Sequence, residues 1–338
     1  MDSFTHIFLG GCLGQIALGK KAGRKAVLWG AIADTVPDFD IFSAFFVHPV
    51  DLLLIHRGFT HSILFACLFS LLGAVLLSRL YDKLGIAWKE WAIVLALGSF
   101  SHLFIDSLTN YGTGLFEPFS HYRVAFTTIF IADPVFTLPM MIGFIVLVLK
   151  RPPLNIKNRF AGVALTLASI YLVWTFVNKS HFESFFRKQF AAQHITIQDQ
   201  VVAPSPLNNI LWGTMGKVDS GYYSGYHSLC SKGDSVLFTF IPNNESMARP
   251  WYGQREFELL RRFTKGYSCI SVGDDGRPYF NDLRDGVIKG WTQPIGHFTF
   301  SYPLVRYSKD TSQLIKANPW PNDGFDGLNS LWDKMWGK

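Results

Sequence analysis

The sequence predicts a mainly α-helical integral membrane domain of about five to six membrane segments, followed by a β-rich α+β soluble domain. Apolar residues make up 49% of the 338 positions and charged residues only 17%, against roughly 25% in typical globular chains. The long apolar runs all end by Asn178. Disordered, collagen-like and coiled-coil chains are excluded, because each needs polar, glycine-periodic or charge-rich sequence. Only 4 cysteines are present, which excludes a disulfide-rich mini-domain.

Four apolar runs are predicted to cross the membrane, since a spanning helix needs about 20 apolar residues. They are His61–Arg79, Trp91–Ile105 with its extension to Leu108, Ile129–Leu149 and Phe160–Asn178. Two shorter runs precede them, Phe4–Gly19 and Ala26–Ala33, and each either spans or re-enters the bilayer. A further run, Ile41–Ile55, is a candidate for the membrane interface. The first run has no basic start, so no cleavable signal peptide is expected.

Residues 179–338 form the predicted second domain, after a membrane domain of residues 1–178. No apolar run in this half is long enough to span a membrane. Short alternating stretches, such as Ser235–Ile241 and Phe298–Leu304, are separated by Gly, Pro, Asn and Asp, a pattern typical of strands and turns. Leu259–Phe263 with its flanking residues predicts one helix.

Lysine and arginine gather in alternate connections of the first domain. Eleven of them lie in the three loops 20–25, 79–89 and 150–159. The connections 34–60 and 106–128 carry one each. Because basic loops stay in the cytoplasm, we expect a multi-pass protein of a bacterial-type inner (plasma) membrane with its C-terminal domain on the outer, periplasmic side. The basic excess thus reflects topology, and no nucleic-acid partner is expected.

Ionisable residues inside membrane segments are costly and usually functional. The orientation gathers such residues in one layer of the outer half of the bilayer: His6, Asp34, Asp38, Asp40, His56, Arg57, His61, His102, Asp106 and Asp133. His102 and Asp106 are four residues apart, on one helical face, and Asp34 and Asp38 share that spacing. Imidazole and carboxylate together suit zinc or a related divalent metal. The predicted metal ligands are His6, Asp34, Asp38, His56, His61, His102 and Asp106.

Further residues are expected to serve the reaction. Arg57 is suited to neutralise an anionic group such as phosphate. Asp38 or Asp40 is a candidate general base, unless it is itself a ligand, or only solvates a loop. Supporting residues, which could instead only cap a helix or shape the outer loop, are Asp133, Tyr111 and Arg123. A proton or ion pathway also uses Asp and His chains, although the repeated halves typical of transporters are not seen.

Four stretches resemble the YdjM-like membrane-bound metal-dependent hydrolases. They are FTHIFLGGCLG from Phe4, AIADTVPDFD from Ala31, HRGFTHS from His56 and SHLFIDSLTNYGT from Ser101. The resemblance covers residues 1–178 and implies hydrolysis more than any one substrate. The stretch Asp282–Trp291 is similar to a soluble domain appended in some members.

The order of these motifs is more distantly similar to that of zinc-dependent phospholipases C and single-strand nucleases. That similarity implies a zinc cluster bound by His6, Asp34 or Asp38, His56 or His61, His102 and Asp106, with Asp106 bridging. The second His-x3-Asp/Glu pair of that superfamily has no counterpart here, because His121, His181 and His194 lack an acid at the fourth position. One or two ions, most simply Zn²⁺, are therefore expected rather than three.

The prediction is an integral membrane metal-dependent hydrolase. A metal-activated water would attack a phosphodiester or a lipid-linked ester at the outer leaflet, so the expected partner is a membrane lipid or a lipid-linked substrate. The alternatives are a lipid amidase that uses the same metal site and a metal or proton transporter. The sequence does not indicate an oligomeric state.

Overall fold

The computed structural model describes residues 1–338 except 274, 288–289, 293–297, 305–323 and 338. The chain forms two compact units, and each unit is built from three separate segments of the sequence. The first unit comprises Met1–Ser43, Ile55–Val177 and Pro206–Asn208. The second unit comprises Ala44–Leu54, Asn178–Ser205 and Asn209–Lys338. The main division therefore falls inside one helix, α7, which runs from Leu154 to Ala192.

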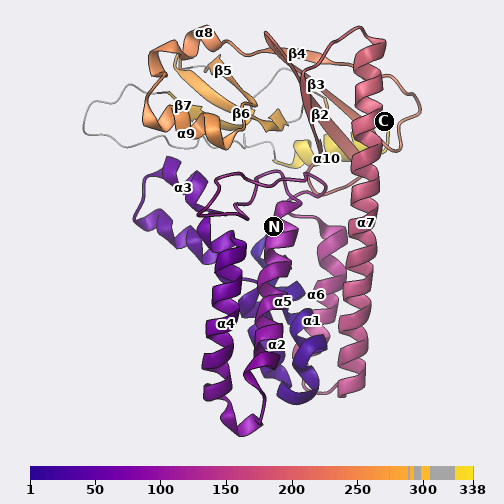
Figure 1. The fold of residues 1–338 in the computed structure, drawn as a ribbon. Helices are drawn as coiled ribbons and strands as arrows, with labels where there is room; N and C mark the ends of the chain where they lie inside the picture. Colours follow the sequence, from indigo (N-terminus) through magenta and orange to yellow (C-terminus); the bar gives the residue numbers. More distant parts are fainter. Residues whose placement is uncertain (274, 288–289, 293–297, 305–323, 338) are drawn as a thin grey trace. The chain divides into compact units, whose positions relative to one another are not determined.

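Helices make up the first unit and run side by side (Figure 1). The α-helices are α1 (Ser3–Ala22), α2 (Arg24–Ala33), α4 (Ile63–Leu80), α5 (Trp88–Ser107), α6 (Pro134–Val148) and the first part of α7. Short 3-10 helices are η1 (Val36–Phe45), η2 (Phe59–His61) and η3 (Asp82–Leu84). The helix α3 (Pro49–Ile55) lies in the connection between η1 and η2, but all of it except Ile55 belongs to the second unit. The predicted helical N-terminal region is confirmed.

Three of these helices begin at a side chain that accepts a hydrogen bond from the backbone of the first turn. Asp2 before α1 and Ser62 before α4 each accept from the amide three residues later, at 3.0 Å. Asp133 caps α6 in the same way, just before Pro134, and proline is favoured at the first helical position. The helix therefore begins later than the predicted segment Ile129–Leu149 and has 15 residues.

Two helices in the described part of the chain, α4 and α7, are long and apolar enough to cross a membrane. This is fewer than the five to six segments that the sequence predicts. Charge and length account for the difference. Helix α1 ends in Lys20 and Lys21, and α5 begins with Lys89 and Glu90, while α2 and α6 have only 10 and 15 residues.

Helices α1 and α2 pack at close range because glycines line their contact. A Cβ atom on Gly30 would lie 2.2 Å from the carbonyl oxygen of Gly10, and one on Gly14 would lie 2.1 Å from that of Ala26. Only glycine permits such an approach of two backbones. A Cβ atom on Gly10 would also lie 2.5 Å from Cβ of Asp34. The glycines thus bring the end of α2 against the N-terminal half of α1.

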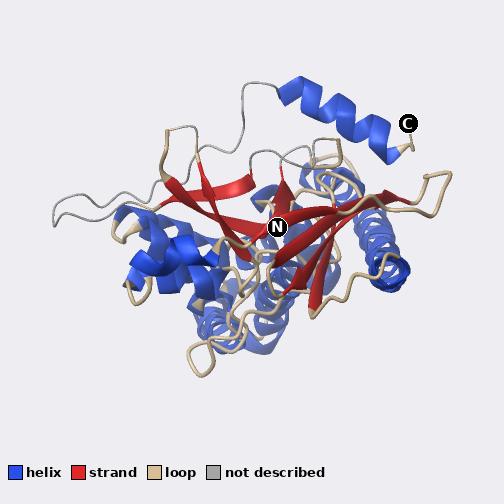
Figure 2. Cartoon of the chain, turned by 90° about the horizontal axis from the view of Figure 1, so that it is seen from above, coloured by secondary structure: helices blue, strands red, loops and turns tan. Residues whose placement is uncertain are grey.

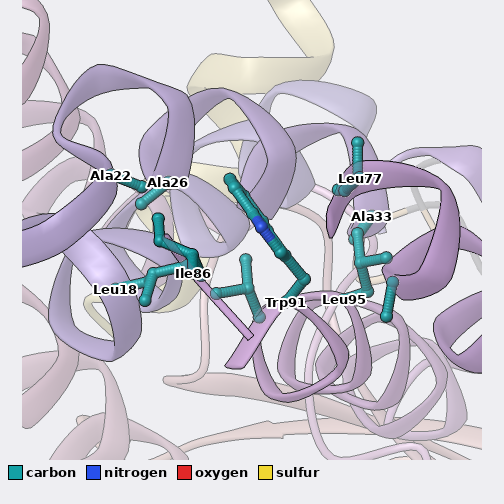
Figure 3. Packing of buried hydrophobic residues seen from close by; sticks show 10 residues of the cluster. Leu18, Ala22, Ala26, Ala33, Leu77, Ile86, Trp91 and Leu95 are labelled. Atoms are coloured by element: carbon teal, nitrogen blue, oxygen red, sulfur yellow. The ribbon is translucent and has the colours of Figure 1, made fainter. Parts of the chain in front are cut away.

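A core around Trp91 of α5 ties α1, α2, α4 and α5 together (Figure 3). The indole is fully buried, and burial of such a ring removes on the order of 150–250 Å² from water or lipid. The residues that surround it, several of them small alanines, are Leu18, Ala22, Ala26, Ala33, Leu77, Ile86 and Leu95. This packing fixes the four helices whose ends carry the ionisable residues of the predicted site.

The second unit contains two antiparallel sheets, seen from above in Figure 2. The first has the order β1 (Asp199–Pro204), β2 (Leu211–Val218), β3 (Gly221–Ser228), β4 (Thr239–Pro242). The second has the order β5 (Ser268–Val272), β6 (Pro278–Val287), β7 (Phe298–Pro303). Its helices are α8 (Glu245–Ala248), α9 (Arg255–Phe263) and α10 (Gly324–Met335), with η4 (Arg249–Trp251). The predicted β-rich domain is therefore confirmed.

Individual elements of this unit follow the sequence pattern closely. Strand β7 corresponds to the predicted run Phe298–Leu304, and α9 contains Leu259–Phe263. Of the run Ser235–Ile241, only the end is a strand. Strand β4 begins at Thr239, which pairs with Ser224 of β3. The apolar face of α9 is buried through Phe257 and Leu260.

Candidate metal centre

Four side chains from three parts of the first unit converge on one buried point. They are Asp38 of η1, His61 at the end of η2, and His102 and Asp106 of α5. One donor atom from each lies within 4.8 Å of the others. His61, His102 and Asp106 are fully buried, and Asp38 is 13% exposed at its side chain. We call these four residues the ligand group.

The spacing of the donor atoms fits a divalent ion. Nε2 of His61 lies 2.9 Å from Nε2 of His102 and 3.4 Å from both Asp38 Oδ1 and Asp106 Oδ2. Nε2 of His102 lies 3.6 Å from the same two oxygens. Tetrahedral zinc with bonds near 2.1 Å requires donor separations of about 3.4 Å. The four histidine–carboxylate separations lie close to this value, while the two imidazole nitrogens lie closer together, at 2.9 Å.

Unsatisfied acceptors support the same interpretation. Oδ2 of Asp38 and Oδ2 of Asp106 are buried and accept no hydrogen bond from the described residues. A buried carboxylate oxygen without a donor is costly unless a cation neutralises it. Nε of Arg57 lies 2.9 Å from Oδ2 of Asp106 and supplies one positive charge there. A metal ion would supply positive charge to both carboxylates, which supports a cation site at the ligand group.

Neighbouring groups turn both histidine rings toward this point. Nδ1 of His102 lies 2.6 Å from the backbone carbonyl oxygen of Asp34, which can only accept. Nδ1 must therefore carry the proton, and the Nε2 lone pair is left for a metal. Nδ1 of His61 lies 3.3 Å from Oδ2 of Asp40 and 3.1 Å from Oγ1 of Thr60, so Nε2 of His61 is also the ring nitrogen that faces the group.

His6 and Asp34 form a second group with His102. Nδ1 of His6 lies 2.9 Å from Oδ1 of Asp34, and Nε2 of His6 lies 3.3 Å from Oδ1 of Asp106. The ring of His6 stacks on that of His102, and the Met1 amine contacts Oδ1 of Asp106. Nδ1 of His102 is already bonded to a carbonyl oxygen, so it is not free to bind an ion in this second group. His6 and Asp34 are therefore better placed to support the ligand group than to hold a separate ion. One ion is favoured over two.

Asp40 closes the base of the connection that follows η1. Its carboxylate accepts hydrogen bonds from the Arg57 backbone amide at 2.9 Å, Thr60 Oγ1 at 2.8 Å and His56 Nδ1 at 2.7 Å. Burial raises the pKa of Asp40, but the hydrogen bonds from His56 and His61 outweigh it and bring the pKa well below its usual range. Both oxygens of Asp40 are thus already occupied by donors from His56, Arg57 and Thr60. The structure places Asp40 and His56 beside the ligand group rather than in it.

Asp38 is also held in its ionised form. Burial raises the pKa of Asp38, but the hydrogen bond from His61 outweighs burial and brings the pKa below its usual range. Its Oδ1 lies 3.4 Å from Nε2 of His61 and 3.6 Å from Nε2 of His102, which is the position of a ligand.

Arg57 occupies a strained backbone conformation, with φ of 58°. Nε of its buried guanidinium lies 2.9 Å from Oδ2 of Asp106 and forms an ion pair that lacks the alignment of a hydrogen bond. Nη1 of the same group donates a hydrogen bond to Oγ1 of Thr109 at 2.6 Å. Strain of this kind is stored where the surrounding structure imposes it, commonly at functional sites. The sequence predicts contact with substrate for Arg57, whereas the structure shows it holding Asp106.

The remaining predicted residues lie further out. The ring of Tyr111 contacts two guanidinium groups, that of Arg57 at 5.1 Å and that of Arg123 at 5.5 Å from the ring centre. Arg123 donates to the His56 carbonyl at 2.6 Å. Asp133 caps α6 and accepts from the Tyr171 hydroxyl at 2.8 Å, so its capping role accounts for it.

Sequence reasoning missed three hydroxyl residues. Thr60, Thr109 and Ser101 bond to Asp40, Arg57 and Asp34, the last at 2.8 Å. Each of them lies within or directly beside a motif already singled out for its ionisable residues. That adjacency was the available signal.

The sequence model of the YdjM inner membrane protein family matches residues 1–182, more than half of the chain. The chain belongs to the YdjM family. The whole ligand group lies inside the matched region, which ends within α7. Most of the β-rich second unit lies beyond it. Membership supports an inner-membrane location for this protein.

Two relatives are similar over part of their length. The inner membrane protein YbcI of Escherichia coli (strain K12) is 34% identical over 112 residues, 33% of this chain and 62% of YbcI. The protein YfhP of Bacillus subtilis (strain 168) is 32% identical over 145 residues, 40% of this chain and 42% of YfhP. The chain thus spans about half the length of the relatives that it matches. No solved structure matches this YdjM-family chain.

Proposed function

We propose that this YdjM-family protein is an integral membrane hydrolase that uses one divalent ion, best matched by zinc, to cleave a phosphodiester or a lipid-linked ester. The observation that carries the proposal is the ligand group, in which two imidazole nitrogens lie 2.9 Å apart and each carboxylate lies 3.4–3.6 Å from them, in a buried site. Asp38, His61, His102 and Asp106 would hold the ion. When bound, such an ion supplies Lewis-acid polarisation of a phosphoryl or carbonyl oxygen.

The surrounding residues prepare the ligand group for that role. Asp40 orients His61, and the carbonyl of Asp34 orients His102, so both rings present Nε2. Arg57 sits against Asp106 and limits its movement. Such outer partners fix ring orientation and raise the basicity of a ligand, and their loss typically lowers metal affinity about 10–100-fold.

A lipid substrate is favoured by the outer face of η1. Asp38 and Asp40 turn inward, whereas Phe39, Ile41 and Phe42 between and after them are about half exposed. The same ten-residue segment therefore offers carboxylates to the ligand group and aromatic rings to its surroundings. Large exposed apolar surfaces of this kind commonly mark contact with lipid or another apolar partner.

The test is lipid hydrolysis by the protein purified into nanodiscs of inner-membrane lipids. We expect phospholipid or lipid-linked ester turnover that Asp106→Asn abolishes, together with about one zinc per chain measured by mass spectrometry. Release of a fatty acid or amine from a ceramide-like amide, without ester turnover, would assign the amidase reaction instead. Uptake of zinc or protons into sealed liposomes without any hydrolysis would contradict a hydrolase and support a transporter.

We further propose that α1, α2, α5 and α6 lie in the membrane with α4 and α7, giving five to six segments, and that the second unit is periplasmic. The support is the excess of basic residues in alternate loops. Cys230 is exposed, whereas burial raises the pKa of Cys269 to about 12 and suppresses its reaction. A membrane-impermeant maleimide should therefore label Cys230 in spheroplasts, and Cys230→Ser should remove the signal. Labelling only after lysis would place this unit in the cytoplasm.

A further inference from the structure

The chain between η1 and η2 is a closed loop. Its base is formed by Asp40 of η1, whose carboxylate bonds to His56 and Arg57 at the end of the connection and to Thr60 of η2. Residues on both sides of this base serve the ligand group: Asp38 lies two positions before Asp40, and His61 follows Thr60 directly. Movement of the loop would therefore be transmitted to two ligands.

The loop itself belongs to the other compact unit. The chain leaves the first unit after Ser43 and returns to it at Ile55, and Ala44–Leu54 is part of the second unit. Val50 of α3 is only 1% exposed. It is a member of a core of the second unit that also contains Ala248, Phe257, Leu260, Ile270, Phe280, Tyr302 and Leu304. Leu53 packs against the same core.

A polar contact accompanies this apolar anchor. The guanidinium of Arg255, at the start of α9, binds the Asp51 carboxylate with two hydrogen bonds, one of them 3.2 Å long. Arg255 is well exposed and Asp51 partly so, and exposed pairs contribute little to stability. Burial of Val50 is therefore the main attachment, and the ion pair orients α3 on it.

We infer that the C-terminal β-rich unit positions the metal-ligand segments of the membrane unit by holding Ala44–Leu54 in its own core. Val50, Leu53 and Asp51 are positioning residues. The attachment acts through the covalent chain on Val36–Phe45 at one end and on His56–His61 at the other. The inference rests on the proposed function only in that these segments serve a metal site.

The experiment measures hydrogen–deuterium exchange of the full-length, metal-free protein in nanodiscs. We expect Val50→Asp to speed amide exchange at least about tenfold in Ala44–Leu54, Val36–Phe45 and His56–His61, while α5 stays protected. Val272→Asp is the matched control, because Val272 is an exposed valine of β5 in the same unit and should leave all three segments unchanged. Val50→Ala is the milder variant, with the same pattern at about two- to fivefold.

The ion pair provides a rescue test. Asp51→Arg should speed exchange in the three segments about two- to threefold, and the double variant Asp51→Arg/Arg255→Asp should restore protection. Faster exchange in Ala44–Leu54 with unchanged exchange in Val36–Phe45 and His56–His61 would overturn the inference. Unchanged exchange in all three segments of Val50→Asp would overturn it too. A separate zinc titration of the wild type tests the metal site, so failure of the proposed function is distinguishable from failure of this inference.

Discussion

The two units bury carboxylates in opposite ways. In the second unit, Asp282 is fully buried, and both of its oxygens accept hydrogen bonds from Arg284, at 2.6–3.2 Å. In the first unit, Asp38 and Asp106 each retain a buried oxygen that accepts no hydrogen bond from the described residues. There, the guanidinium of Arg57 forms an ion pair with Asp106. Asp34 and Asp40 are two further buried carboxylates of this unit.

Under the proposed function, this difference separates a structural carboxylate from carboxylates that would bind a metal. A buried pair with complete hydrogen bonding has no further need of a ligand. A group of acceptors turned toward one point has the opposite property, because a bound cation would stabilise it further, beyond the charge that Arg57 supplies to Asp106. The contrast predicts that substitutions in the two units affect different measurements.

The largest effect is expected from Asp106→Asn. The amide is nearly the size of the carboxylate but lacks its charge, so zinc content should fall from about one per chain to none. Mass spectrometry of the purified protein measures this. Removal of the ion by a chelator should lower the unfolding temperature of the wild type, since ligands that bind only the folded state stabilise it. Asp106→Asn should not respond to the chelator, and a zinc content equal to wild type would contradict the ligand group.

Arg284→Met tests the other side of the comparison. It leaves Asp282 buried without its partner, and breaking such a pair costs about 3–5 kcal/mol. Denaturant unfolding of the second unit, followed by tryptophan fluorescence, measures the loss. The double variant Asp282→Leu/Arg284→Met should recover most of it, because no isolated charge remains. Zinc content should stay at the wild-type level if the pair is purely structural.

Gly30→Ala should reduce both stability and metal binding. The added Cβ would lie 2.2 Å from the Gly10 carbonyl oxygen, so α1 and α2 must separate, at a cost of about 1–3 kcal/mol. The shift moves His6 and Asp34 away from His102 and weakens zinc binding. Gly162→Ala on α7 is the matched control, because nothing lies within 4 Å of its added Cβ. Thermal unfolding in detergent and zinc titration provide the two readouts.

The smallest effect is expected from Asp133→Ala. Loss of the cap of α6 should cost about 0.5–2 kcal/mol, and the bond from Tyr171 is lost with it. Zinc content should not change, since Asp133 caps a helix rather than facing the ligand group. A lower unfolding temperature with full zinc occupancy is the expected result. Loss of zinc in this variant would show that the site extends to α6.

Much of the site could be predicted from local spacing. His102 and Asp106 share a helical face because they are four residues apart, and the structure brings both to one point. The role of Arg57 could not be predicted, because its contact with Asp106 joins residues 49 positions apart. The pairing of Asp40 with His56 has the same origin. It depends on how a loop closes, and no periodicity in the sequence encodes that closure.

The sequence by itself determined a helical, apolar first part, a β-rich second part and a set of ionisable residues too costly to bury without a purpose. Those properties follow from composition and short-range spacing, which act within a few residues. The tertiary structure decided which nitrogen of each histidine faces the ligand group, which carboxylates belong to that group and which lie beside it. It also decided that Ala44–Leu54 belongs to the second unit. These outcomes depend on contacts between distant segments, because packing selects among orientations that the local sequence leaves equivalent.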